Sequence, residues 1–242
     1  MKYELETIPV WDAIKDDKEC FLCTLMKQSE QDAVSYYLGS SVMHPETRVS
    51  INKTGFCPSH WTMLAQSGAP QSLALIIHTY LGQTKKELEK VFSMLGPTKE
   101  GKKTQSVLQK IAQVVRHREE GCLICSQMEK RLLRYTYTTV QLWKDDHDFR
   151  LAFETSKGVC LHHMQSLFSM ASETLGPLQA KAFSVALTHL IALNLQRLED
   201  DVLWMTQKYK AENIKKSWNG CEDAHKRAVM KLVGESRLID PL

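Results

Sequence analysis

The segment Cys20–Cys23 reads C-F-L-C, and 102 positions later the segment Cys122–Cys125 reads C-L-I-C. A second pair of motifs follows at nearly the same interval, G-F-C-P-S-H at Gly55–His60 and G-V-C-L-H-H at Gly158–His163. The chain therefore holds two copies of one unit, in which 33 or 34 residues separate a C-x2-C motif from a C-x2-H motif. Six of the seven cysteines belong to this repeat.

This spacing is typical of zinc sites, whereas ordinary buried cysteines are the alternative explanation. Seven cysteines scattered at random would give about 0.2 pairs at an offset of three, and this chain has two such pairs. Four thiolate or imidazole ligands close a zinc site. The sequence therefore predicts one Cys3His metal site in each half, with the ligands Cys20, Cys23, Cys57 and His60 in the first, and Cys122, Cys125, Cys160 and His163 in the second.

The residues around each C-x2-H motif fit this chemistry. Gly55 and Gly158 stand two positions before the cysteine, where a residue free to adopt positive φ allows a tight turn. A cysteine and a histidine three positions apart share one face at the start of a helix, and the positive end of the helix dipole favours thiolate. Four protein ligands leave no open position, which is typical of structural rather than catalytic zinc.

Two residues beside these motifs leave alternatives open. His162 can replace His163 as a ligand, although only His163 matches the position of His60. Cys221 lies outside the repeat and has His225 four positions later, which allows a reactive thiol beside a base. A half-buried, unreactive cysteine is the simpler interpretation of Cys221.

The remaining sequence predicts an all-α protein. Glycine (11) and proline (7) are scarce, apolar residues recur at helical spacing, and strand-like alternation is nowhere sustained. We expect a first metal-binding helical repeat at 1–97, a linker and amphipathic helix at 98–119, a second metal-binding repeat at 120–218, and a C-terminal helix and tail at 219–242.

Composition excludes several classes of function. The net charge of +3 over 242 residues is too small for a typical nucleic-acid-binding protein. The acidic N-terminal segment lacks the features of a signal peptide, and the most apolar segments, Ser72–Gly82 and Ala180–Leu195, read as buried core helices rather than membrane spans. We therefore expect a cytoplasmic protein whose thiols stay reduced.

Known catalytic signatures are missing, because the sequence contains no G-x-G-x-x-G, G-x4-G-K-[ST], H-E-x-x-H or G-x-S-x-G motif. This favours a protein that is not an enzyme.

Five motifs together resemble an uncharacterised bacterial family, mostly from anaerobic Firmicutes, that is classified only as a domain of unknown function. They are W-D-A-I-K-x3-E-C-x2-C at Trp11–Cys23, the second C-x2-C at Cys122–Cys125, the two G-x-C-x2-H motifs, and H-K-R-A-V-M-K-L-V-G at His225–Gly234. The family usually has proline after the first cysteine of each pair, where this chain has Phe21 and Leu123. The resemblance covers essentially the whole chain and implies an all-helical metal-binding protein.

Three hypotheses for function follow. In the first, two structural Zn(II) ions hold a binding or scaffold module for a protein, a peptide or a small ligand. In the second, the cysteines bind an iron–sulfur cluster for electron transfer. In the third, a zinc-bound thiolate acts as a sensor or as a nucleophile. The oligomeric state stays open.

Overall fold

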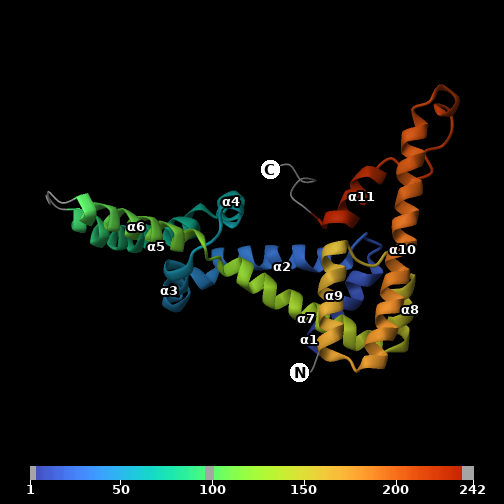
Figure 1. Cartoon of the computed structure of the whole chain (residues 1–242), viewed down its shortest axis with the longest axis horizontal. Coiled ribbons are helices and arrows are strands. Elements are labelled where there is room, and N and C mark those ends of the chain that lie inside the picture. Colours follow the sequence, from blue (N-terminus) through green and yellow to red (C-terminus); the bar gives the residue numbers. More distant parts are fainter. Residues whose placement is uncertain (1–3, 96–100, 236–242) are drawn as a thin grey trace. The chain divides into compact units, whose positions relative to one another are not determined.

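The computed structural model describes residues 4–95 and 101–235, with side chains described from residue 6 and, after the gap, from residue 104. In these ranges the chain is all-helical, with eleven α-helices, three short 3-10 helices and no strand (Figure 1). The predicted fold class is therefore confirmed. Residues 98–100 of the predicted linker and residues 236–242 of the predicted tail lie outside the described residues.

The helices follow one another with short connections. The first six are α1 (Glu4–Lys15), α2 (Phe21–Leu38), α3 (Pro45–Thr54), α4 (Pro58–Gln66), α5 (Pro70–Phe92) and α6 (Gly101–Glu119). The other five are α7 (Leu123–Asp145), α8 (His147–Thr155), α9 (Leu161–Thr174), α10 (Pro177–Lys208) and α11 (Ala224–Val233). The 3-10 helices are η1 (Ser40–Met43), η2 (Ser93–Leu95) and η3 (Ala211–Asn213).

The helices form two compact units. Unit 1 combines the two ends of the chain, Met1–Gln28 and Arg131–Leu242, and unit 2 is the central part, Ser29–Lys130. The boundaries between the units fall inside α2 and α7. They differ from the repeat boundaries that the sequence suggests, near 97 and 120, so each unit takes residues from both halves of the repeat.

Each unit has a core rich in aromatic rings. In unit 1, Phe153 stacks against Phe149 and also contacts Phe21 and Phe183, and all four side chains are fully buried. In unit 2, the core consists of Tyr37, Phe56, Trp61 and Tyr80, each ring in contact with the next, together with apolar side chains such as Ile51, Leu64 and Ile76. Aromatic side chains bury large areas, so each unit has its own hydrophobic centre.

Local signals explain where several helices begin. Asp146 precedes α8, and its carboxylate accepts hydrogen bonds from the backbone N–H groups of Asp148 and Phe149 at 3.0 and 3.1 Å. Pro45 reads in the sequence as the start of a return loop, but it begins α3. This expectation was wrong because proline is well suited to the first turn of a helix, where its missing N–H has no partner to lose.

Two glycines place the short helices α4 and α9. Gly55 and Gly158 both have a φ of 73°, as the repeat predicts. A Cβ atom on Gly55 would lie 2.7 Å from the Tyr80 hydroxyl, and one on Gly158 would lie 3.1 Å from Leu190. These turns therefore need glycine both for backbone conformation and for space.

One helix in the described ranges, α10, has the length and composition to cross a membrane, with a mean hydropathy of 1.2 over its most apolar 18 residues. Core helices of soluble proteins pass the same test. Helices α8, α9 and α11 pack against α10, and Phe183, Leu187 and Leu190 are buried there. The opposite face, which includes Leu178 and Val185, is exposed, so only one face of the predicted core helix is buried.

Replacing Gly158 by alanine should lower the free energy of unfolding by about 1–3 kcal/mol, because alanine is strained at positive φ and its Cβ would press on Leu190. Gly68 is the matched control, since its φ is 78° but a Cβ there meets nothing within 4 Å. Urea unfolding of the two variants should show the larger loss for Gly158→Ala. An equal or larger loss for Gly68→Ala would contradict the packing argument.

Candidate metal centres

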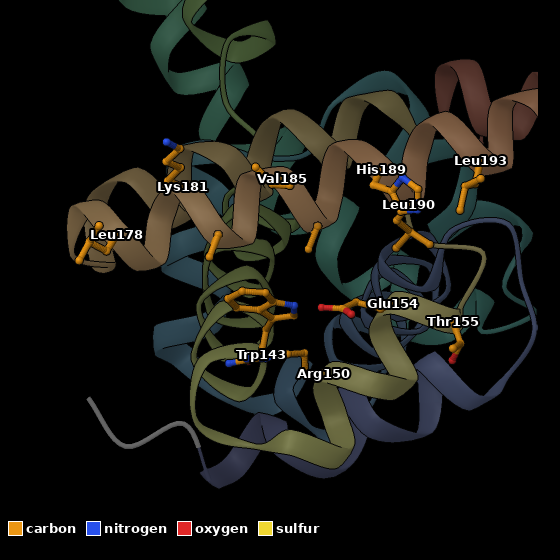
Figure 2. A pocket seen from close by; sticks show the side chains of 12 residues that line it. Trp143, Arg150, Glu154, Thr155, Leu178, Lys181, Val185, His189, Leu190 and Leu193 are labelled. Atoms are coloured by element: carbon orange, nitrogen blue, oxygen red, sulfur yellow. The ribbon is translucent and has the colours of Figure 1, made fainter.

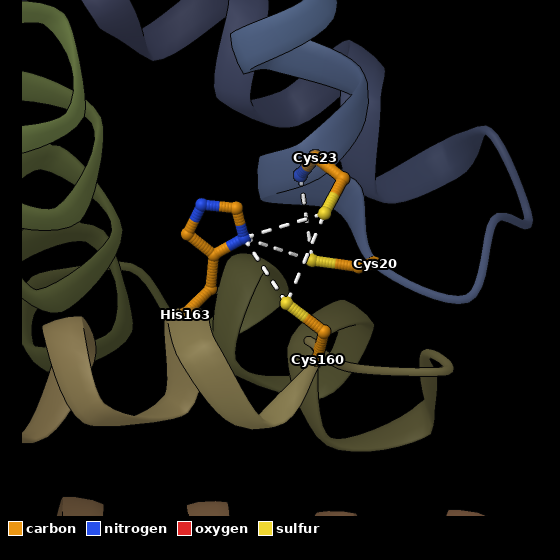
Figure 3. A group of neighbouring side chains, drawn as sticks. All are labelled: Cys20, Cys23, Cys160 and His163. Carbon is orange, nitrogen blue, oxygen red and sulfur yellow. Dashed lines mark hydrogen bonds between the residues drawn. The ribbon is translucent and has the colours of Figure 1, made fainter. Parts of the chain in front are cut away.

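Four of the predicted residues meet in unit 1 and form what we call site A (Figure 3). Cys20 and Cys23 come from the start of α2, and Cys160 and His163 from the start of α9. The Nδ1 atom of His163 lies 3.3 Å from the sulfurs of Cys20 and Cys160 and 3.4 Å from that of Cys23. All four side chains are buried, so these donors face one another rather than solvent.

The other four predicted residues meet in unit 2 and form site B. Cys122 and Cys125 come from the start of α7, and Cys57 and His60 from the start of α4. The Nδ1 atom of His60 lies 3.1 Å from the sulfurs of Cys57 and Cys122 and 3.4 Å from that of Cys125. His60 and Cys122 are buried, whereas Cys57 and Cys125 are half-buried. Site B is therefore the more open of the two.

The predicted pairing of the motifs was wrong, although the eight residues do gather into two Cys3His groups. The sequence analysis joined Cys20 and Cys23 to Cys57 and His60, within one half of the repeat. In the structure each C-x2-C motif meets the C-x2-H motif of the other half, so both sites combine the two halves.

Helix length gives the physical reason for this exchange. The 23 residues of α7 rise about 34 Å, whereas the nine residues of α8, which follows, rise only about 14 Å. The short helix α8 therefore cannot lead the chain back along the whole of α7. As a result, the second C-x2-H motif does not reach the C-x2-C motif at the start of α7.

A backbone hydrogen bond fixes the exchanged pairing in the same way at both sites. The N–H of Phe21, just after the first cysteine of site A, donates to the carbonyl of Gly158 at 3.4 Å. At site B the N–H of Leu123 donates to the carbonyl of Gly55 at 3.1 Å. The two sites therefore share one local architecture, built from equivalent residues of the repeat.

All eight donors lie at the N-termini of helices. Cys57 and Cys160 are the N-caps of α4 and α9, while Cys20 and Cys122 directly precede α2 and α7. Each site thus receives the positive ends of two helix dipoles, each worth about half an elementary charge. This arrangement favours the thiolate form that binds metal.

The distances between sulfurs fit one ion at each site. A tetrahedral zinc ion with Zn–S bonds of about 2.3 Å separates two sulfurs by about 3.8 Å. The sulfurs of Cys23 and Cys160 are 3.8 Å apart, and those of Cys57 and Cys125 are 3.9 Å apart. Three sulfurs and one imidazole nitrogen at this spacing can therefore hold a single metal ion.

Helix α11 and the residues after it cover site A. The backbone N–H of Glu235 donates to the sulfur of Cys23 at 3.4 Å, and a Cβ on Gly234 would lie 3.5 Å from the sulfur of Cys160. The fully buried ammonium group of Lys231 donates to the carbonyls of Glu19 and Lys157, which belong to the two loops that lead into the site. Lys231 therefore holds these loops together and brings positive charge near the thiolates.

At site B, Glu30 orients the histidine. Its carboxylate lies 2.8 Å from Nε2 of His60, on the side of the ring away from the sulfurs. Such a carboxylate fixes the tautomer and makes the coordinating nitrogen more basic.

Two of the donors of site B, His60 and Cys125, hold protons in the absence of a cation. Burial disfavours the charged form of His60, but hydrogen bonds with Cys122 and Glu30 outweigh it and raise the pKa to about 10. Burial, followed by a hydrogen bond with Cys122, raises the pKa of Cys125 to about 12. For Cys122, the hydrogen bond with His60 outweighs burial and lowers the pKa to about 6.

Site A follows the same pattern. Burial opposes the charged form of His163, but hydrogen bonds with Cys160 and Cys20 raise its pKa to about 9. Hydrogen bonds with Cys160 and Cys20, together with burial, raise the pKa of Cys23, whereas hydrogen bonds with Cys20 and Cys23 lower that of Cys160. One thiol at each site is thus held as thiolate while another keeps its proton.

The structure distinguishes between the alternatives that the sequence left open for His162 and Cys221. His162 is exposed, and its ring is tilted by 57° against that of His163, which alone reaches the sulfurs. Cys221 is buried rather than half-buried, its sulfur lies 3.5 Å from an oxygen of Asp201, and burial raises its pKa. These features fit an unreactive thiol.

Sequence reasoning missed Glu30 and Lys231. Glu30 is one of many acidic residues on helices, and no local pattern marks it. Lys231 lies within the H-K-R-A-V-M-K-L-V-G segment that carried the family resemblance, which was a usable signal.

Comparison with known proteins identifies the family. The sequence model of a family described as a family of unknown function (DUF6062) matches residues 1–238, so the chain belongs to this family. This confirms the resemblance found from the motifs. A search of curated proteins and a search of solved structures gave no match. Any statement of function therefore rests on the geometry described above.

Paired cysteine variants test the exchanged pairing by metal content. Replacing Cys20 and Cys160 by serine disrupts site A alone, so about one of two zinc ions should remain bound. Replacing Cys20 and Cys57 disrupts both sites, so little zinc should remain. Native mass spectrometry can count the ions, with Cys221→Ser as the control that keeps both. If the Cys20 and Cys160 variant lost nearly all its zinc while the Cys20 and Cys57 variant kept one ion, the motifs would instead pair within each half.

Metal uptake should release protons. At pH 7 both His60 and Cys125 are protonated, with pKa values of about 10 and 12, and both must lose that proton to bind metal. We expect at least two protons per ion at site B, one from His60 and one from Cys125, and affinity should therefore fall at least about hundredfold when the pH drops from 8 to 7. Calorimetric titrations of the Cys20→Ser/Cys160→Ser variant in buffers of different ionisation enthalpy measure this number. Release of less than one proton would contradict the expectation.

Proposed function

We propose that this member of a family of unknown function is a binding module whose helices are held by two structural zinc ions and whose ligand is a small amphipathic molecule. The zinc ions would be bound by Cys20, Cys23, Cys160 and His163 at site A, and by Cys57, His60, Cys122 and Cys125 at site B. When bound, each ion would crosslink the starts of two helices that are far apart in the sequence.

The observation that carries this proposal is the closed donor set at each site. Three sulfurs and one nitrogen already supply the four ligands of a tetrahedral ion, so no position is left for a substrate or a catalytic water. In site A the residues after α11 also cover the sulfurs. A metal enclosed in this way supports a structural role, and under this proposal a ligand binds elsewhere on the protein.

The same geometry favours zinc over the two alternatives raised by the sequence. An iron–sulfur cluster distributes its protein ligands over two or more irons, which requires a wider spacing than the 4.8 Å within which all four donor atoms of each site lie. A thiolate sensor needs sulfurs that reagents can reach. The sulfur-bearing residues of site A are buried, and those of site B are buried or half-buried.

The binding surface that we favour is a groove in unit 1, here called the α10 groove, between α10 and the ends of α7 and α8 (Figure 2). Its volume is about 790 Å³, which lies in the range of small-molecule sites. One wall is the exposed apolar face of α10, where Leu178, Val185 and Leu193 are 86%, 61% and 55% exposed. Trp143 and Glu154 line the other wall.

One polar group in the α10 groove lacks a partner. Trp143 is 4% exposed, and its Nε1 has no hydrogen-bond partner among the described residues. Figure 2 shows the indole nitrogen pointing toward the Glu154 carboxylate. A buried donor without a partner costs about 1–3 kcal/mol. A ligand group that accepts from Trp143 and donates to Glu154, such as an alcohol or an amide, would satisfy both.

Octan-1-ol is a suitable probe, because it joins an apolar chain to one group that accepts and donates. Calorimetry of the zinc-loaded protein should detect binding, and Trp143→Phe should weaken it roughly tenfold, the value of one hydrogen bond. Trp204→Phe is the matched control, since the Nε1 of Trp204 already donates to Ser217. Chelation of zinc should remove both octan-1-ol binding and helical circular dichroism.

Different results would contradict the metal part and the ligand part of this proposal. Fewer than one zinc ion per chain, or full helicity after chelation, would contradict the structural role of the metal. Binding of octan-1-ol that is unchanged in Trp143→Phe and in Val185→Arg, which fills the groove, would contradict the site.

A further inference from the structure

The end of α11 and the two residues after it lie over the sulfurs of site A. A Cβ on Gly234 would lie 3.5 Å from the sulfur of Cys160 and 3.6 Å from that of Cys23. The backbone N–H of Glu235 also donates to the sulfur of Cys23 at 3.4 Å. Residues 231–235, here called the lid, therefore contribute to the burial of these sulfurs.

The two ends of this segment are attached to different helices of unit 1. Helix α11 packs against α10 and α9 (Figure 1), and Arg227, in its first half, pairs with Asp201 on α10 at 2.8 Å. At the far end of the lid, the Glu235 carboxylate pairs with Lys27 on α2 at 2.8 Å. The start of α11 is thus anchored on α10, whereas the lid contacts the helices that carry the donors of site A.

Equivalent positions of the repeat show why site A needs this third segment. At site B, a Cβ on Gly121 would lie 2.7 Å from the side chain of Thr54 and 3.1 Å from its carbonyl oxygen, so the two segments that lead into the site pack directly. The equivalent residues at site A are Glu19 and Lys157. Their carbonyls both accept hydrogen bonds from the ammonium group of Lys231, which therefore joins two segments that direct packing joins at site B.

Lys231 couples the lid to the segments that lead into site A. Its side chain is fully buried, and its Nζ lies 3.5 Å from the carboxylate of Glu19, which is itself buried and pairs with Arg197 at 2.6 Å. A buried ammonium group is strongly unfavourable without acceptors. Lys231 keeps its acceptors only while the carbonyls of Glu19 and Lys157 stay close together, which is the arrangement that completes site A.

Coupling of this kind acts in both directions. Because the lid stabilises the closed arrangement of donors, a metal ion at site A stabilises the docked lid in return. An incoming ligand must come within bonding distance of a bound ion to remove it, and at site A the lid has to open first. At site B, Cys57 and Cys125 are half-buried, so an incoming ligand has less protein to displace.

We propose that the lid traps the ion of site A, with Lys231 as the positioning residue that holds the lid closed, so that site A retains its metal while site B exchanges its ion with zinc in solution. The inference rests on the proposed binding of zinc at both sites and is independent of the α10 groove. It gives the two centres different roles, a permanent one in unit 1 and an exchangeable one in unit 2.

Exchange of radioactive zinc on the full-length protein measures this difference. Protein loaded with radioactive zinc is mixed with an excess of unlabelled zinc, and the radioactivity that stays with the protein is followed over time. We expect two phases of equal amplitude, with rates that differ by about tenfold or more. The Cys20→Ser/Cys160→Ser variant should keep only the fast phase, and the Cys57→Ser/Cys122→Ser variant only the slow phase.

A single substitution in the lid tests the role of Lys231. Lys231→Met should accelerate the slow phase by about tenfold or more, because methionine fills a similar space but donates no hydrogen bond to the two carbonyls. The fast phase, the zinc content and the helical circular dichroism should not change. Lys226→Met is the matched control, since Lys226 is exposed on the same helix.

Hydrogen exchange tests the same coupling without any change in the lid. In the Cys20→Ser/Cys160→Ser variant, which lacks site A, the backbone amides of α11 should lose about tenfold or more of their protection. In the Cys57→Ser/Cys122→Ser variant, which lacks site B, their protection should be that of the wild type. Equal protection of α11 in the two variants would contradict the coupling.

The exchange experiment separates this inference from the proposed function. Two bound ions that exchange at rates within about twofold of each other, unchanged by Lys231→Met, would overturn the lid and leave the proposed zinc binding intact. Equal acceleration in Lys226→Met would contradict the role of Lys231. A protein that binds fewer than one zinc ion per chain would contradict the proposed function itself, before any exchange is measured.

Discussion

Everything else in the structure depends on the convergence of helix N-termini on two clusters of thiols and imidazole. At site A the starts of α2 and α9 meet, and at site B the starts of α7 and α4 meet, each with a backbone hydrogen bond from the first helix to the glycine before the second. Positive helix ends that meet repel one another, and the negative thiolates offset that cost, since even with a divalent cation a Cys3His cluster would carry a net charge of −1. Because both sites join the two halves of the repeat, neither half holds a complete site alone.

Much of this arrangement follows from the sequence, and the missing part has a physical cause. The donors, the turns at Gly55 and Gly158, and the helical class follow from local patterns, since helix starts and zinc ligands have short-range signatures. The pairing of motifs does not, because two identical C-x2-C motifs fit two identical C-x2-H motifs equally well on local chemistry. Only helix length separates the two solutions, and α3, which read as a loop, hid that comparison. Glu30 and Lys231 were missed because their roles depend on tertiary contacts alone.

The two sites share an architecture but differ in their surroundings. Site A is buried, covered by Gly234 and Glu235, and tied together by Lys231, whereas site B has two half-buried cysteines and a histidine oriented by Glu30. In the proposed function, closed metal sites would fix the helices, and the outer face of α10 would be available to a ligand. In this account the metal supplies rigidity, and recognition belongs to the helical surfaces.

Diffraction from crystals of the zinc-loaded protein at wavelengths around the zinc absorption edge tests the central claim most directly. The account predicts two anomalous peaks per chain, one about 2.3 Å from the sulfurs of Cys20, Cys23 and Cys160, and the other equally close to those of Cys57, Cys122 and Cys125. A peak bound jointly by Cys20 and Cys57, or the absence of any peak at these residues, would contradict it.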